Sequence, residues 1–338
     1  LVVFLAVAEA VADWPLLATA APGEILVVGD PSLGVLKEVL KHDPKSVDYV
    51  VLDSSFLDLV KPYLDAQDTA ALRDSRINIH YGDLRNFVKD RENKYDTVII
   101  NIREVPNLKL NRFYTKEFYS QIKSILRPNG ILAISVASSE NYLSAQTRTF
   151  NSSVYRTLKS VFDNIEMIPG DTIMFLSSPS PIDMRKETIL ERFKRRRISN
   201  RYFIPSYIEY RLTPSRRAEL KGVLEGAPLA EINRDFRPTT YYYFINFWLN
   251  KFTSPLEYLA GGLLGLIIAV IIFHGIGKYT LIFFTERKEC ILIFALGFVS
   301  VLLEVILLLA FQIISGYVYW QMGILFASFM LGLFLGAV

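Results

Sequence analysis

The chain has 338 residues, which is long enough for two domains of ordinary size. Its formal net charge of +3 is too small to argue for a nucleic-acid partner, and the basic run at 194–197 lacks the interleaved aromatic residues of an RNA-binding surface. We interpret that run as a solvated helix face. The single cysteine, Cys290, excludes a disulfide framework and a cysteine-based zinc site, and no metal site is predicted.

Apolar residues are distributed unevenly along the chain. Up to about residue 253 they alternate with charged residues, whereas 254–338 is almost entirely apolar. We therefore expect a soluble module followed by a membrane module. The expected divisions are the remnant of an N-terminal element over 1–21, an α/β domain over 22–178, a charged helical connector with interfacial aromatic residues over 179–253, and truncated membrane helices over 254–338.

Short β-rich runs alternate with helical patterns in the first half of the chain. Five of these runs are 24–29, 48–53, 77–82, 96–101 and 131–137. Their alternation with helices predicts βαβ units and a parallel sheet covered on both faces. Two further runs, 164–168 and 172–178, are separated only by the tripeptide PGD, which predicts an antiparallel hairpin at the sheet edge. This architecture is typical of transferases that use adenosyl cofactors, whose ligand lies beyond the carboxyl ends of the strands.

Three sequence blocks resemble spermidine synthase, the polyamine aminopropyltransferase: PLLATAAPGEILVVGDPSLGVLKEVLKH, DSRINIHYGDLRNFVKDRENKYDTVIIN and FYTKEFYSQIKSILRPNGILAIS. The similarity covers roughly residues 9–178 in order. It implies an α/β fold with a Rossmann-like, class I methyltransferase-type sheet of seven strands, here followed by a transmembrane helical domain. It also implies decarboxylated S-adenosylmethionine as the aminopropyl donor and a polyamine as the acceptor.

The resemblance places the family's cofactor-binding positions on residues that are only partly preserved. These vestigial candidates are Gly29, Ser32, Gly34, Asp53, Gly82 and Asp83. Family members carry a GGGDGG loop after the first strand, and Pro31 and Leu33 reduce the capacity of this loop to hold the donor. Val51 stands at the family's ribose-binding glutamate, where it cannot accept a hydrogen bond. Asp83 has two readings of equal weight, an adenine-side contact and a helix cap.

The end of the fourth strand carries the chemistry in this family, typically as Asp-Ser-Thr-Asp, and reads NIRE at 101–104 here. A carboxylate attracts a cationic amine and takes its proton, and Asn101 can do neither. Glu104 can supply negative charge, but Arg103 beside it repels a polyamine. Upstream, the family's Tyr-His-Glu reads VAE at 7–9. We therefore expect a domain that has kept the fold and lost its ligand chemistry.

The C-terminal region is expected to cross a membrane over about 255–276, 290–314 and 317–338, because each run reaches the ~20 apolar residues of a bilayer crossing. The second run carries Glu304 and Gln312 on one face, which should look into protein or water rather than lipid. This polar face has a functional reading as a proton or cation site. The simpler reading, which we favour, is a protonated Glu304 hydrogen-bonded to another helix. The region also resembles bacterial proteins in which a spermidine-synthase-like domain is fused to a multi-span, transporter-like region.

Three function classes compete on these grounds. We favour a membrane-anchored, catalytically degenerate protein that binds no cofactor and acts as a structural or interaction subunit of a membrane assembly. The alternatives are an active membrane-bound aminopropyltransferase of polyamine biosynthesis and a transporter-like protein with a domain that senses a nucleoside or polyamine. The expected partners are the lipid bilayer and other membrane subunits or missing parts of the same chain, with no nucleic acid. The resemblance to bacterial fusion proteins implies the bacterial cytoplasmic (inner) membrane, and Lys278, Arg287 and Lys288 between the first two spans predict that the soluble domain is extracytoplasmic.

Overall fold

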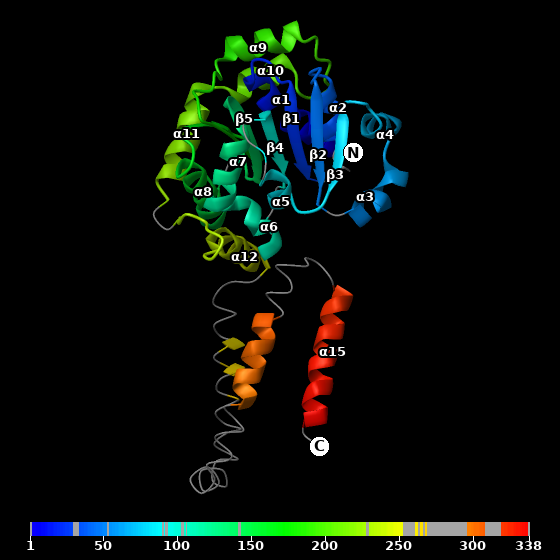
Figure 1. Cartoon of the computed structure of the whole chain (residues 1–338). Coiled ribbons are helices and arrows are strands. Elements are labelled where there is room, and N and C mark those ends of the chain that lie inside the picture. Colours follow the sequence, from blue (N-terminus) through cyan, green and yellow to red (C-terminus); the bar gives the residue numbers. More distant parts are fainter. Residues whose placement is uncertain are drawn as a thin grey trace, which may run out of the picture. The chain divides into compact units, whose positions relative to one another are not determined.

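Figure 1 shows the computed structural model of the chain. The structure describes residues 2–29, 34–52, 54–89, 91, 94–102, 105, 107–140, 143–227, 230–252, 261–262, 264–265, 268, 296–307 and 319–336. The chain divides into two units, Leu1–Ile245 and Asn246–Val338.

The first unit is built on a mixed sheet of seven strands. These are β1 (Glu24–Gly29), β2 (Ser46–Val51), β3 (Ile77–Tyr81), β4 (Tyr95–Asn101), β5 (Leu126–Ala137), β6 (Asn164–Ile168) and β7 (Thr172–Ser178). Their order is β3-β2-β1-β4-β5-β7-β6. Strands β1 to β5 pair in parallel, whereas β7 pairs antiparallel with both β5 and β6. The predicted Rossmann-like sheet with an antiparallel hairpin at one edge is therefore confirmed.

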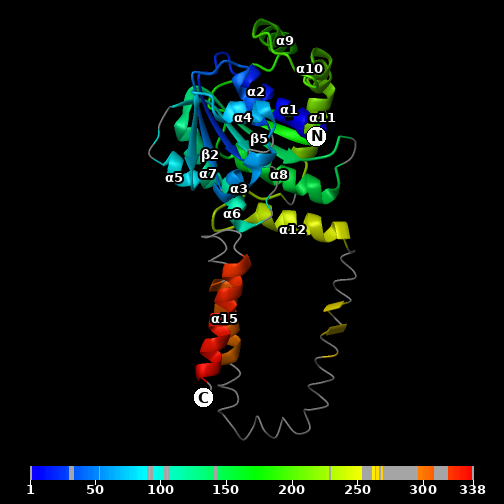
Figure 2. The ribbon, with the colours of Figure 1, turned by 90° about the vertical axis from the view of Figure 1, so that its right-hand side faces the viewer.

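Helices lie on both sides of this sheet (Figure 2). One face shares a hydrophobic core with α1 (Val2–Ala18), α2 (Val35–Leu40), α4 (Ala66–Leu72), α9 (Lys186–Arg195) and α10 (Pro205–Arg211). Contacts with β5 and β6 are made by α7 (Lys116–Ile125), α8 (Ala145–Lys159) and α11 (Pro214–Glu225). The remaining elements are α3 (Ser54–Val60), η2 (Lys61–Tyr63), α5 (Leu84–Val88), α6 (Leu108–Asn111), η3 (Arg112–Tyr114), α12 (Thr239–Phe252) and α15 (Tyr319–Gly336). The central strands β1 and β4 are buried along most of their length, as expected where helices cover both faces of a sheet.

Several strand boundaries differ from the sequence expectation. Strand β2 ends at Val51, before the predicted end at 53, and β5 begins at Leu126 rather than at 131. The sequence PNG at 128–130 resembles a turn, yet the chain stays in the sheet there. A register shift between Tyr95 and Thr97 on the neighbouring strand accommodates it.

The basic run at 194–197 does more than face solvent. The guanidinium of Arg196 donates hydrogen bonds to the carbonyl oxygens of Leu16 at 2.6 Å and Thr19 at 2.8 Å. These carbonyls belong to the end of α1, where helical hydrogen bonds run out. Arg196 is therefore a C-terminal cap for α1, and the interpretation of the whole run as a solvated face is wrong for this residue.

The second unit does not support the predicted membrane spans. Among the residues that the structure describes, no helix has both the length and the apolar character that a bilayer crossing requires. Most of the first predicted span, about half of the second, including Gln312, and both ends of the third lie outside those residues. Glu304 is only 6% exposed, but its Oε1 atom has no hydrogen-bond partner within the described part of the chain. The predicted hydrogen bond from Glu304 to another helix is therefore not found there.

Candidate functional site

The strand order reverses between β1 and β4, because β1 leads to β2 and β3 whereas β4 leads to β5. Gly29 and Asn101 pair at the carboxyl ends of these two strands. In open α/β sheets, ligands bind beyond the carboxyl ends at such a reversal. The candidate site is therefore the edge formed by the ends of β1 to β4.

Three of the predicted site residues at this edge are glycines with a positive φ. The angles are 135° at Gly29, 67° at Gly34 and 128° at Gly82. At Gly29 a Cβ atom would lie 2.5 Å from the carbonyl oxygen of Asn101, so no side chain fits between the two strand ends. The hydroxyl of Tyr49 in β2 donates a hydrogen bond of 3.0 Å to the carbonyl oxygen of Gly29 and fixes the end of β1 from the other side.

Asn101 is the buried polar side chain at the centre of this edge. Its residue is 5% exposed, and its Oδ1 atom has no hydrogen-bond partner among the described residues. It borders a cavity of about 10 Å³ that is also lined by Gly29 and Tyr49, which has room for no more than one water molecule. A buried acceptor without a donor destabilises a fold by ~1–3 kcal/mol. A water molecule in this cavity, or a ligand N–H or O–H group that takes its place, would remove that penalty.

Asp83 is a helix cap held by an arginine. Its Oδ1 atom accepts hydrogen bonds from the backbone N–H groups of Arg85 at 2.9 Å and Asn86 at 3.2 Å. Its Oδ2 atom accepts from Nη1 of Arg112 at 2.9 Å. The cap interpretation of Asp83 is thus confirmed. Oδ1 already accepts two hydrogen bonds and Oδ2 only one, so Oδ2 keeps a free lone pair and an adenine-side contact stays a prediction.

A polar network behind Asp83 was not visible in the sequence. Arg85 donates from both terminal nitrogens to the carboxylate of Asp235, at 2.7 and 2.6 Å, and its Nη2 atom also donates to the carbonyl oxygen of Arg112 at 2.6 Å. Burial alone would raise the pKa of Asp235, but hydrogen bonds from Arg85 and Thr115 outweigh it and hold that pKa below its usual value. No local spacing could have revealed this pair, because 150 residues separate Arg85 from Asp235.

The other predicted site residues are placed as follows. Ser32, Asp53 and Glu104 lie outside the described residues, so their roles stay predictions. Glu9 is buried in α1, and its carboxylate accepts hydrogen bonds from the three consecutive backbone N–H groups of 201–203, at 2.9, 2.8 and 2.8 Å. Glu9 therefore anchors the chain after α9. Within the described part of the chain, no cluster of three or more His, Cys, Asp or Glu side chains is arranged to hold a metal ion.

Residues 5–175, about half of the chain, match the spermine/spermidine synthase domain. The chain belongs to this family. Strands β1 to β6, the positive-φ glycines Gly29, Gly34 and Gly82, and Asp83 all lie within the matched residues.

Curated relatives carry the name polyamine aminopropyltransferase. The protein from Korarchaeum cryptofilum is 31% identical over 220 residues, which cover 62% of this chain and 66% of the relative. The protein from Saccharolobus solfataricus is 31% identical over 148 residues, covering 43% of this chain and 47% of the relative. That from Bacillus mycoides is 33% identical over 156 residues, covering 46% and 54%. The chain thus spans between 47% and 66% of the length of these relatives.

Solved structures agree on the fold. A spermidine synthase in complex with the transition-state analogue AdoDATO has a TM-score of 0.53 and 20% sequence identity, with 66% of this chain and 74% of that chain covered. The spermidine synthase of Thermotoga maritima gives the same values. At this level of identity the likeness shows the fold alone.

The sequence-based preference for a membrane-anchored, non-catalytic subunit is therefore wrong. The relatives are named as enzymes of aminopropyl transfer, and the described helices include none that could cross a bilayer. The alternative, an aminopropyltransferase, is better supported. The preference treated each departure from the family motif as a loss, although Gly29, Gly34 and Gly82 keep the positive φ angles that glycine allows.

Proposed function

We propose that this chain is an aminopropyltransferase that moves the aminopropyl group of decarboxylated S-adenosylmethionine to an amine of the polyamine class. The family supplies the reaction class. The observation that carries the proposal is the buried Oδ1 atom of Asn101, which has no donor among the described residues and lies where the ends of β1 and β4 meet. An acceptor at this position suits the N–H group of an incoming amine.

The transfer needs a neutral amine whose lone pair points at the carbon beside the sulfonium. A nitrogen–carbon bond forms, the carbon–sulfur bond breaks, the sulfur leaves as a neutral thioether and the attacking nitrogen gives up a proton. Asn101 accepts a hydrogen bond from the amine and orients it. An amide oxygen cannot take the proton, so the proton leaves to water. The rate should therefore rise with pH up to the pKa of the free amine, about 10 for an alkylamine.

The test incubates the protein with decarboxylated S-adenosylmethionine and either putrescine or spermidine. Chromatography measures the methylthioadenosine that is released. Asn101→Leu keeps the side-chain volume but removes the acceptor, and it should lower the rate about tenfold or more. Asn101→Asp supplies a carboxylate that can take the proton, so it should raise the rate at about pH 7 and flatten the pH profile. Asn78→Leu is the matched control, because Asn78 is exposed and its side chain donates a hydrogen bond of 3.0 Å to the Ser46 hydroxyl, at the opposite end of the strands from Asn101.

The proposal fails if the folded protein releases no methylthioadenosine with either amine. Folding is checked by circular dichroism on the same samples. If turnover occurs but Asn101→Leu leaves its rate and pH profile unchanged, the reaction class stands and the role of Asn101 is wrong.

A further inference from the structure

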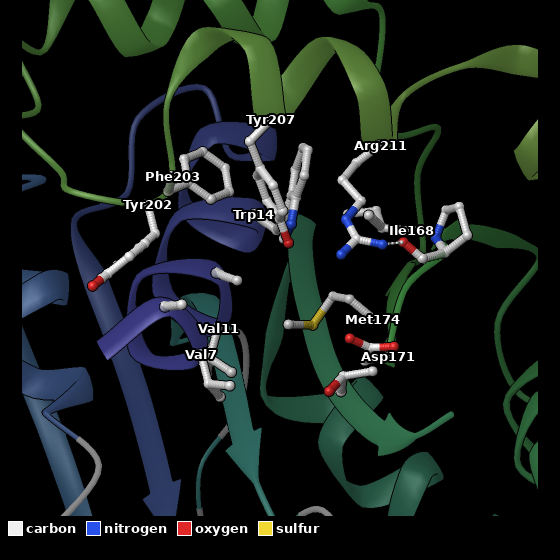
Figure 3. A pocket seen from close by; sticks show the side chains of 14 residues that line it. Val7, Val11, Trp14, Ile168, Asp171, Met174, Tyr202, Phe203, Tyr207 and Arg211 are labelled. Atoms are coloured by element: carbon white, nitrogen blue, oxygen red, sulfur yellow. Dashed lines mark hydrogen bonds between the residues drawn. The ribbon is translucent and has the colours of Figure 1, made fainter. Parts of the chain in front are cut away.

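A larger cavity lies between α1, the β6–β7 turn and the region of α10 (Figure 3). Its volume is about 510 Å³, within the ~300–1,000 Å³ of small-molecule sites. The apolar and aromatic lining includes Val7, Val11, Trp14, Met174, Phe203 and Tyr207. Two charged side chains, Asp171 and Arg211, complete it. The cavity therefore combines a large apolar surface with one negative and one positive group.

The aromatic part of the lining is a packed cluster. The ring centroids of Trp14 and Phe203 are 4.8 Å apart in an edge-on arrangement, and those of Phe203 and Tyr207 are 5.6 Å apart. Figure 3 shows Trp14 projecting from α1 and Tyr207 from α10 into the same space. Such rings offer a rigid wall for an apolar or aromatic ligand group.

The charged part of the lining lies at the β6–β7 turn. Nη1 of Arg211 donates to the carbonyl oxygen of Pro169 at 3.0 Å and to Oε1 of Glu140 at 2.7 Å. The Nε atom of Arg211 is buried and has no partner among the described residues. Among the lining residues drawn in Figure 3, Arg211 is bonded to the turn whereas the carboxylate of Asp171 has no bond. The side chains of Arg211 and of the exposed Asp171 thus both border the cavity.

The charge of Arg211 is only partly neutralised by the protein. Glu140 also accepts from Nη2 of Arg216 at 3.1 Å, so one carboxylate serves two guanidinium groups. The Arg211 side chain is 12% exposed, and charge interactions are screened little at such a position. A further carboxylate, supplied by a ligand, would balance the second guanidinium.

Two features position the walls of the cavity. Glu9 fixes the backbone of 201–203 through three hydrogen bonds of 2.9, 2.8 and 2.8 Å, which positions Phe203. The missing side chain of Gly170 makes room for Arg211, since a Cβ atom there would lie 2.5 Å from Nη1. The cavity is therefore preformed rather than assembled by a ligand.

We propose that this cavity binds an apolar α-amino acid as its zwitterion. The ligand carboxylate meets Arg211, the ammonium group meets Asp171, and the side chain packs against the cluster of Trp14, Phe203 and Tyr207. A polyamine suits these walls poorly, because it carries several positive charges and Arg211 repels them. The proposal does not depend on the proposed function, since it concerns binding rather than transfer.

The test is isothermal titration calorimetry of the whole chain with three probes that each contain a phenyl ring: L-phenylalanine, phenethylamine and hydrocinnamate. Phenethylamine lacks the carboxylate, and hydrocinnamate lacks the ammonium group. Phenylalanine should bind, and each probe that lacks one charged group should bind about tenfold or more weakly, the effect of one charge-assisted hydrogen bond. Arg211→Gln should remove the difference between phenylalanine and phenethylamine. Asp171→Asn should remove the difference between phenylalanine and hydrocinnamate.

Two further variants keep the test decisive. Arg185→Gln is the matched control, because the Arg185 side chain is 76% exposed, and it should leave all three affinities unchanged. Gly170→Ala keeps the Arg211 side chain but displaces it, so this variant should also remove the difference in affinity between phenylalanine and phenethylamine. It replaces Arg211→Gln in the test if Arg211→Gln does not fold. Equal binding of phenylalanine and phenethylamine, tighter binding of hydrocinnamate, or no binding of any probe overturns the proposal. A chain that fails this test can still release methylthioadenosine, so the two proposals are judged separately.

Discussion

The carboxylate of Asp48 forms hydrogen bonds with three side chains, those of His80, Lys94 and Tyr95. Its Oδ1 atom lies 2.9 Å from Nε2 of His80, and its Oδ2 atom accepts from Lys94 Nζ and the Tyr95 hydroxyl, both at 2.6 Å. Burial alone would raise the pKa of Asp48, but the hydrogen bonds from Lys94, Tyr95 and His80 outweigh it and lower the pKa from 3.8 to about 2. The folded protein therefore prefers the ionised form more strongly than the unfolded chain does.

This preference predicts a pH-dependent contribution to stability. Because the pKa is lower in the folded state, the contribution is complete above the unfolded value of 3.8 and is lost as the pH falls toward about 2. Asp48→Asn should lower the free energy of unfolding at neutral pH by ~2 kcal/mol, and this deficit should shrink below about pH 4. Urea denaturation across the acid range measures it. Asp43→Asn, at a side chain that is 96% exposed, should have little effect, and a deficit in Asp48→Asn that does not change with pH would contradict the assignment.

At the scale of residues, the sequence reveals local contacts and hides distant ones. The cap formed by Asp83 was one of two readings, because a capping residue and the N–H groups it accepts from are neighbours in the chain. Its partner Arg112 is 29 residues away, and the pair of Arg85 and Asp235 spans 150 residues. Only the fold brings such groups together. The departure at Asn101 was visible, but its burial without a donor was not.

At the scale of elements, the attachment of the chain after α9 to α1 depends on Glu9. Glu9→Gln replaces two carboxylate oxygens with a single neutral acceptor, so at least one N–H of 201–203 loses its partner. The free energy of unfolding should fall by ~1–3 kcal/mol. Hydrogen exchange at the amides of 201–203 should become faster, which mass spectrometry can follow. Glu191→Gln on α9, at a side chain that is 73% exposed, is the control, and unchanged exchange in Glu9→Gln would show that the anchor is not needed.

The elements themselves were largely predictable because their physical causes are local. Strand β1 has four consecutive buried residues, and an apolar run of that kind between helical patterns indicates a covered parallel strand. The hairpin of β6 and β7 followed from the turn at 169–171. The start of β5 could not be predicted, since the sequence PNG also suits a turn and only the register shift on β4 keeps it in the sheet.

At the scale of the whole molecule, the division into two units predicts that the first folds alone. The start of α12 belongs to it: the Thr240 hydroxyl is 3.3 Å from that of Ser153, and the rings of Phe150 and Phe244 are 6.2 Å apart. A chain that ends after Phe252 should keep a cooperative thermal transition at the midpoint of the full chain. A chain that ends after Pro238 loses these contacts and should unfold at a lower temperature. Circular dichroism compares the two, and equal midpoints would show that α12 contributes nothing to the first unit.

For the apolar C-terminal region, hydropathy alone was not enough to predict membrane spans. Hydropathy reports the composition of a window, whereas a bilayer crossing also requires one continuous helix of sufficient length. No helix among the described residues meets both requirements. The expected partners and cellular location of the chain stay predictions.

The pair of Arg85 and Asp235 also has a consequence for biosynthesis. A ribosome makes the chain from its N-terminus, so α5 and its cap emerge long before Asp235 does. Until that residue is outside the ribosome, the guanidinium of Arg85 lacks the carboxylate of Asp235 and keeps only the Arg112 carbonyl and the Thr115 hydroxyl as partners from this network. The edge of the sheet beside Asp83 thus reaches its final form only after almost the whole first unit has been translated.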